Sequence, residues 1–327
     1  MKLKDWKMRT IVLLFGFLFL LVPALSIAQQ YPTKPINILM GYSPGGTVDT
    51  IFRPLASAAE KYMGQPLVML NNGAGGGTVA LGLIVKEKPD GYNLEVCHSG
   101  LLTTTPHIRA LSYKLDDLVP IMSFGYSQSS LAVRADAPYK TFKELVEYAR
   151  KNPGKFTYFH GTTGGPTHLA MEVPARKEGV QFTPVPFPGG AQALTALLGG
   201  HIGGFTGGSH LPHVRAGTLR ILVVFSEKRL KEFPDVPTLL DLGYDFAAED
   251  LFTIVAPKGV APSIVKKVDE SFQKAMDDPK FIQAMGKLEI VINYRSPEDI
   301  RKYLYEAYAR FGKLIQEFNI PKEEEKK

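Results

Sequence analysis

The apolar positions along the chain switch repeatedly between a strand-like and a helix-like spacing. Runs such as Ile36 to Met40 predict buried strands, whereas the apolar stripe between Val48 and Met63 predicts a helix. Alternation of the two in the first hundred residues predicts a parallel, doubly wound α/β sheet. The predicted strands are 36–40, 67–70, 93–97, 130–134, 156–159, 183–187, 219–225 and 290–293, and the predicted helices are 48–63, 78–86, 141–151, 167–177, 191–198, 262–277 and 297–317.

The alternation restarts near residue 130, and the last quarter of the chain returns to helices. Chains of roughly 300 residues commonly divide into two domains. We therefore expect one α/β domain built from 31–129 together with 252–320, and a second from 130–251. Residues 321–327 are expected to form a charged, solvated tail.

The first 28 residues have the layout of a secretory signal peptide. Four basic residues within the first nine precede an unbroken apolar run at 11–22, and Ser26 and Ala28 are small residues two positions apart. The run is shorter than the ~20 residues that a membrane-spanning helix needs. We expect cleavage after Ala28 and a periplasmic protein, with a retained membrane anchor as the alternative.

Charge and cysteine content narrow the possible classes of function. Cleavage would remove four basic residues and Asp5, which lowers the formal charge from +6 to +3. A weak positive charge suits anionic ligands, but the chain has no Lys/Arg-rich block, so no nucleic-acid partner is expected. Cys97 is the only cysteine. We expect it to be a small buried residue on a strand, with a catalytic thiol as the alternative.

Four glycine-rich turns each lead from a predicted strand into a predicted helix. A helix start leaves backbone N–H groups unpaired and carries partial positive charge, and glycine lets a ligand approach that backbone closely. Such turns bind anions without Lys or Arg, and in open α/β sheets they gather at the carboxyl ends of the strands. A single glycine-rich turn of this kind is common in α/β proteins, but four of them could converge on one cleft. The four turns lie at 41–47, 71–78, 161–167 and 188–191.

The turns do not match the known nucleotide fingerprints. The chain has no GxxxxGK[ST], and no G-x-G-x-x-G is followed by a ribose-binding acid in the right frame. No cofactor is therefore expected, and carboxylates become the expected anions. The pair His210 and His213 has no third ligand nearby in sequence, so we expect a core or surface pair and no metal site.

The segment Gly41-Tyr42-Ser43-Pro44-Gly45 matches the G-x-S-x-G elbow of serine hydrolases and sits between a predicted strand and a predicted helix. Pro44 has no N–H to contribute to an oxyanion hole, and the strand is the first of the mature chain, whereas an elbow needs several strands before it. A hydrolase that uses Ser43 is therefore kept only as an alternative.

Three charged or titratable residues lie at the starts of predicted helices. Asp49 and Arg53 are one turn apart, and we expect an ion pair that fixes the helix start. His168 follows Thr167 in the third turn. Two roles stay open for His168, capping the turn or contacting a ligand.

A series of motifs runs in order through nearly the whole mature chain. It comprises Tyr31-Pro32-Thr33-Lys34-Pro35-Ile36, Pro44-Gly45-Gly46-Thr47-Val48-Asp49 with Arg53, Gly64-Gln65-Pro66, Asn71, Gly76-Gly77, Pro89-Asp90-Gly91-Tyr92, His168-Leu169-Ala170, Gly189-Gly190, Leu197-Leu198-Gly199-Gly200, Ala216-Gly217-Thr218-Leu219-Arg220 and Pro234-Asp235-Val236-Pro237-Thr238. As a set, these motifs resemble the receptors of tripartite tricarboxylate transporters, also called Bug-type binding proteins.

The resemblance implies a two-domain, periplasmic-binding-protein-like (type II, Venus-flytrap) α/β fold that closes on a ligand in the cleft between its lobes, without catalysis. It implies a monomeric receptor that captures a di-, tri- or aromatic carboxylate and delivers it to membrane permease subunits. A sensor subunit for a membrane kinase is the alternative. The ligand-binding residues that the resemblance implies are Ser43, Gly45, Gly46, Thr47, Asp49, Thr163, Gly165, Thr167, His168, Gly189, Gly190 and Ala191.

The chain departs from the usual pattern of that family at several positions in these turns. Asn72 and Gly73 stand where Arg-Pro is usual, Gly165 where serine is usual, Pro188 where lysine is frequent, and Gly203 where aspartate is frequent. The missing serine and lysine predict a ligand unlike that of the common pattern.

Overall fold

The computed structural model describes residues 31–161, 163–187 and 189–322. The predicted signal peptide, Pro188 and the last five residues of the predicted tail lie outside the described residues. Residues 31–33 belong to a separate unit, and the fold below is that of the described residues from 34 onward.

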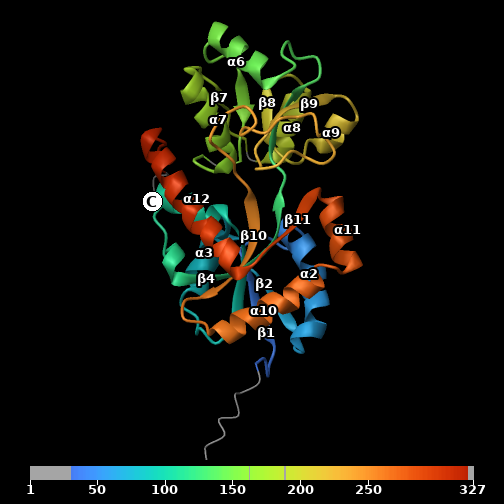
Figure 1. Cartoon of the computed structure of the whole chain (residues 1–327), viewed down its shortest axis with the longest axis vertical. Coiled ribbons are helices and arrows are strands. Elements are labelled where there is room, and N and C mark those ends of the chain that lie inside the picture. The colour runs from blue at the N-terminus through green and yellow to red at the C-terminus, as the bar shows by residue number, and fades with distance from the viewer. Residues whose placement is uncertain (1–30, 162, 188, 323–327) are drawn as a thin grey trace, which may run out of the picture. The chain divides into compact units, whose positions relative to one another are not determined.

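The larger sheet has six strands in the order β11-β4-β10-β3-β1-β2. Figure 1 labels β1, β2, β4, β10 and β11 of this sheet. β1 pairs in parallel with β2 and β3, as the sequence predicts. The other half of the sheet, for which the sequence predicts no pairing, is antiparallel: β10 runs antiparallel to β3 and β4, and β4 runs antiparallel to β11. The sheet is therefore mixed, and its antiparallel neighbours need no crossover helix between them. The strands are β1 (Ile36–Met40), β2 (Leu67–Asn71), β3 (Asn93–His98), β4 (Leu118–Ser127), β10 (Asp250–Pro257) and β11 (Ile290–Arg295).

The smaller sheet has five strands in the order β7-β6-β8-β5-β9. β6 pairs in parallel with β7 and β8, whereas β5 runs antiparallel to β8 and β9. The chain passes from β4 of the larger sheet to β5 of this one, and from β9 back to β10. The strands are β5 (Ser130–Arg134), β6 (Thr157–Phe159), β7 (Thr183–Pro184), β8 (Gly204–Gly207) and β9 (Leu219–Val224).

Helices follow most of the strands, and their starts agree with the sequence signals. Thr141, the N-cap of α6, accepts a hydrogen bond from Glu144 N through its Oγ1 at 3.2 Å, and Glu144 Oε2 accepts from the N–H of Lys140, the residue before the N-cap. The helices are α2 (Thr47–Met63), η2 (Ala74–Gly77), α3 (Thr78–Ile84), α4 (Gly100–Thr103), α5 (Thr105–Ile108), η3 (Leu115–Asp117), α6 (Phe142–Lys151), α7 (Pro166–Glu178), α8 (Gly190–Leu198), α9 (Leu211–Arg215), α10 (Pro262–Ala275), α11 (Pro279–Lys287) and α12 (Pro297–Glu317).

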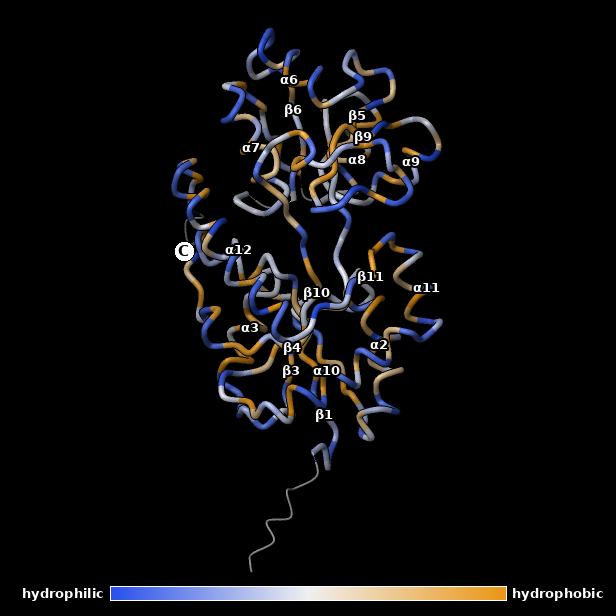
Figure 2. Tube along the Cα trace, viewed as in Figure 1, coloured by the Kyte–Doolittle hydropathy of each residue, from blue (hydrophilic) through white to orange (hydrophobic). Residues whose placement is uncertain are grey.

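The cores form where the apolar strand positions meet the apolar helix stripes, and Figure 2 shows hydrophobic residues concentrated along the strands and on parts of the helices. α2 packs on α10 through the stacked rings of Phe52 and Phe272, 5.6 Å apart. Cys97 is fully buried on β3, as expected for a small core residue.

Helix α12 contributes to two separate hydrophobic clusters. Ile300 packs in the cluster that contains Cys97 of the larger sheet. Phe311, three turns further on, packs in the cluster that contains Leu169 and Phe246. The domain boundaries at 130 and 252 remain a prediction, and any movement between two lobes would have to accommodate this helix. Within the described ranges, no helix is long and apolar enough to cross a membrane.

Candidate functional site

The first two glycine-rich turns are packed directly against each other. A Cβ atom added at Gly41 would lie 2.6 Å from Gly77 Cα, which leaves room only for glycine at this approach. Asn71 Nδ2 donates to Tyr42 O at 3.1 Å and ties the end of β2 to the first turn. The carboxyl ends of β1 and β2 therefore hold one continuous surface of turn backbone.

Asp49 anchors the first turn from inside α2. Its carboxylate accepts hydrogen bonds from Arg53 Nε, Gly45 N and Asn71 Nδ2, each at 2.9 Å. The hydrogen bond from Arg53, with those from Gly45 and Asn71, outweighs burial and lowers the pKa of Asp49 to about 2. The predicted ion pair with Arg53 is confirmed, and the carboxylate is committed to holding the turn.

His168 has the equivalent task in the third turn. Its Nδ1 accepts a hydrogen bond from Gly164 N at 2.9 Å, so the ring is neutral with its proton on Nε2. Burial, reinforced by the neighbouring His160 ring 4.4 Å away, lowers the pKa of His168 to about 4. The ring is buried and caps the turn, which is one of the two roles that the sequence left open.

A cavity of about 190 Å³ brings parts of three turns together. The first turn contributes Tyr42, the second Gly76, and the third Gly165 at the start of α7. A Cβ atom added at Gly100 would lie 3.9 Å from Pro166 Cδ, so segments attached to the two sheets meet here. The cavity is lined by Tyr42, Gly76, His98, Gly100, Leu101, Thr104, Thr105, Gly165, Pro166 and Asp250.

A histidine–aspartate pair forms the charged part of this lining. His98 Nδ1 lies 3.1 Å from Asp250 Oδ2, and Asp250 Oδ1 accepts from Gly100 N at 3.1 Å. Burial alone would lower the pKa of His98 and raise that of Asp250. The mutual attraction outweighs burial, so the pKa of His98 is raised and that of Asp250 is lowered. The pair therefore tends toward the charged form of both groups.

The structure places the predicted site residues at different depths. Of that set, Gly165 lines the cavity, and the other members, as far as the chain is described, lie outside its lining. Asp49, Gly165 and His168 are buried, Gly46, Thr167, Gly189 and Gly190 are half-buried, and Ser43, Gly45, Thr47, Thr163 and Ala191 are exposed.

Sequence reasoning did not single out the polar lining residues. Tyr42 lies inside a turn that was recognised, and His98 directly follows a predicted strand, so both carried a weak signal. Asp250 opens β10, a strand that was not predicted, and Thr104 and Thr105 lie where no element was predicted. The antiparallel pairing of Phe252 with His98 brings Asp250 to this position.

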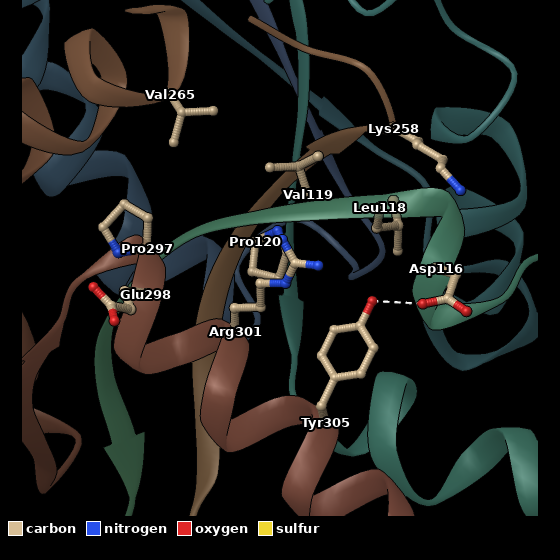
Figure 3. Close-up of a pocket in the computed structure, with 10 residues that line it drawn as sticks. All are labelled: Asp116, Leu118, Val119, Pro120, Lys258, Val265, Pro297, Glu298, Arg301 and Tyr305. Carbon is tan, nitrogen blue, oxygen red and sulfur yellow. Dashed lines mark hydrogen bonds between the residues drawn. The ribbon is translucent and has the colours of Figure 1, made fainter. Parts of the chain in front are cut away.

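A larger cavity of about 450 Å³ lies beside β4 of the larger sheet (Figure 3). It is lined by residues of β4, α10 and α12 together with neighbouring loops, and Tyr305 Oη donates to Asp116 Oδ1 at its rim. None of its lining residues belongs to a glycine-rich turn. The smaller cavity is therefore the candidate ligand site.

Comparison with known proteins decides the class of the chain. The profile of the tripartite tricarboxylate transporter family receptor matches residues 51–320. The chain belongs to this receptor family. A relative in Cupriavidus necator, the UPF0065 protein in the gbd 5′ region, is 35% identical, and the match covers 92% of each chain.

Solved structures of the receptor family share the fold. A TctC solute-binding protein from Polaromonas matches with a TM-score of 0.81 and 29% identity over 88% of this chain and 99% of its own. MatC from Rhodopseudomonas palustris, solved with bound malate, matches with a TM-score of 0.69 and 25% identity over 87% of this chain and 100% of its own. The family consists of solute-binding receptors and not of enzymes, which agrees with the non-catalytic prediction and leaves the hydrolase alternative without support.

Proposed function

We propose that this receptor binds a small carboxylate in the cavity lined by Tyr42, His98 and Gly165, and delivers it to the permease subunits of a tripartite tricarboxylate transporter. The meeting of three glycine-rich turns in one cavity carries the proposal, because turn backbone at helix starts favours anions. A malate-bound relative of similar fold supports the carboxylate. Capture by closure of two lobes, as a monomer, is part of the same proposal.

The proposed place of action is the periplasm, after cleavage behind Ala28. The basic start and short apolar run of the first 28 residues support export, and the receptor family consists of periplasmic binding proteins. The other turn residues of the predicted set, from Ser43 to Thr47 and from Gly189 to Ala191, are proposed to reach the ligand when the lobes close.

A thermal-shift panel tests the carboxylate proposal. The mature chain is heated with C3 to C6 mono-, di- and tricarboxylates, benzoate, neutral sugars and cationic amines. We expect at least one carboxylate to raise the Tm, since a ligand at 100 times its Kd stabilises the folded state by about 2.7 kcal/mol. A clear shift with a sugar or an amine and none with any carboxylate would contradict the proposal.

The substitution Gly165→Ser should strengthen carboxylate binding. Gly165 is the N-cap of α7, has φ −72° and ψ 172°, and makes no side-chain cap hydrogen bond. A serine fits that backbone, its oxygen can accept from the helix N–H groups, and its proton can be donated into the cavity. We expect about tenfold tighter binding and a gain of a few tenths of a kcal/mol in stability, measured by calorimetric titration and by unfolding. Unchanged or weaker binding of every carboxylate would contradict this role.

A further inference from the structure

We propose that Asp250 makes this cavity selective for carboxylates that also carry a hydrogen-bond donor, a hydroxyl or an ammonium group, close to the carboxylate. The inference rests on the proposed function and adds to it the chemistry of the rest of the ligand. The basis is the hydrogen-bonding capacity of the lining: some of its polar groups can still donate a hydrogen bond, and others can only accept one.

The two threonines of the lining have already used their protons. Thr104 Oγ1 donates to Gly100 O at 2.9 Å, and Thr105 Oγ1 donates to the same oxygen at 3.1 Å. A hydroxyl has one proton and two lone pairs, so each threonine keeps only acceptor capacity toward a ligand. Neither can receive a carboxylate oxygen, which is itself an acceptor.

Asp250 is also an acceptor. Its oxygens take hydrogen bonds or charge contacts from Gly100 N, from His98 Nδ1 and, at 3.5 Å, from Ser99 Oγ, but a carboxylate has about four lone-pair positions and these partners use at most three of them. The side chain is 32% exposed, so part of it faces the cavity that it lines. Asp250, Thr104 and Thr105 thus form an acceptor wall, which a ligand can satisfy only with donor groups.

A donor for the carboxylate of the ligand lies elsewhere in the lining. Tyr42 Oη accepts from His98 N at 2.8 Å, which leaves its own proton to be donated. Burial raises the pKa of Tyr42 well above its usual value, so this proton is present at neutral pH. A ligand with a carboxylate at one end and a donor beside it matches both halves of the cavity. A plain dicarboxylate would place acceptors against acceptors, which is unfavourable because the wall would lose its water without replacement.

Matched ligand series separate the donor from chain length. Calorimetric titration compares propionate, lactate and alanine, then succinate, malate and aspartate, then glutarate, 2-hydroxyglutarate and glutamate. Within the series whose length fits, we expect the hydroxyl- or ammonium-bearing member to bind at least tenfold tighter than the unsubstituted member. Tighter binding of the hydroxyl-bearing member indicates a receptor for hydroxy acids, and tighter binding of the ammonium-bearing member indicates a receptor for amino acids.

The variant Asp250→Asn tests the residue itself. It keeps the shape of the side chain but replaces one acceptor by a donor. The ratio of the affinity for the substituted acid to that for the unsubstituted acid should therefore fall at least fivefold, and the affinity for the unsubstituted acid should change less. Asp116→Asn, an exposed acid at the rim of the other cavity, is the matched control and should leave all ratios unchanged. If loss of the contact between Asp250 and Gly100 prevents Asp250→Asn from folding, Thr104→Val is used in its place. It removes a hydroxyl acceptor from the same wall.

The outcomes are distinct from those of the proposed function. If the unsubstituted acid binds as tightly as its substituted partners, or if Asp250→Asn changes all ligands of a series by the same factor, the selectivity proposal is wrong. Binding of adipate or benzoate, with no binding in the three series, also overturns it while the carboxylate receptor stands. If no carboxylate binds at all, the proposed function itself fails.

Discussion

The variant Gly41→Ala is expected to lose about 3 kcal/mol of stability and most of its ligand binding. The new methyl group would lie 2.6 Å from Gly77 Cα and 3.1 Å from Gly77 O, and both are backbone atoms that cannot rotate away. The first and second turns would have to separate, which moves Tyr42 and Gly76 in the cavity lining. We expect the Tm to fall by about 5–10 °C in a thermal melt.

The matched control is Gly161→Ala, in the third turn. Gly161 is exposed, and a Cβ atom added there meets nothing within 4 Å. Its stability should therefore change by no more than about 0.5 kcal/mol. If Gly41→Ala melts within a degree of the wild type, the two turns are not packed as the structure shows.

Replacing Glu95 by leucine should stabilise the protein by about 2 kcal/mol at neutral pH. Glu95 lies on β3 with no exposed surface, and neither carboxyl oxygen has a hydrogen-bond partner among the described residues. A buried polar group without a partner costs roughly 1–3 kcal/mol, and leucine removes that cost at similar volume. Urea unfolding at pH 7 measures the change, and a leucine variant less stable than the wild type would mean that Glu95 has a partner or role of its own.

The variant Glu95→Gln distinguishes the cost of ionising Glu95 from the cost of burying a polar side chain. Burial raises the pKa of Glu95 well above its usual value of 4.5, so folding favours the protonated form. Below about pH 4.5 Glu95 is protonated in the unfolded chain as well, so its raised pKa does not change the free energy of unfolding. As the pH rises above that value, the raised pKa lowers the free energy of unfolding more and more. The glutamine variant should therefore match the wild type near pH 4 and exceed it at pH 7. An equal difference at both pH values would contradict the account.

Local pattern was enough to predict much of the fold. β1 and β5 were predicted with the bounds that they have, and α12 was predicted from Pro297 to Glu317, because each pairs a clear apolar period with proline or polar residues at its ends. The motif series predicted the receptor family, which the family profile confirms.

The elements that were missed contradict local propensity. β4 contains Pro120, which argues against a central strand, but Pro120 sits beside a register shift opposite Val255 where a ladder hydrogen bond is not required. β8 is half glycine, because a Cβ atom at Gly204 would lie 2.6 Å from Phe156 Cζ. In both cases tertiary packing overrides strand propensity.

The candidate site was only partly predictable for a related reason. Strand-to-helix turns are local features, so Gly165 could be named from sequence. The pairing of His98 with Asp250 depends on the register of β10 against β3, between residues about 150 positions apart in the chain. No periodicity or motif encodes that register, and the acceptor wall follows from it.

A crystal structure of the mature protein with the tightest-binding carboxylate of the thermal-shift panel tests the central claim most directly. The account predicts that the ligand occupies the cavity lined by Tyr42, Gly165 and Asp250, with a carboxylate oxygen within hydrogen-bonding distance of turn backbone or of Tyr42 Oη. A ligand found instead in the cavity lined by Arg301 and Lys258 (Figure 3), or one held by its apolar part with the carboxylate in solvent, would contradict the account.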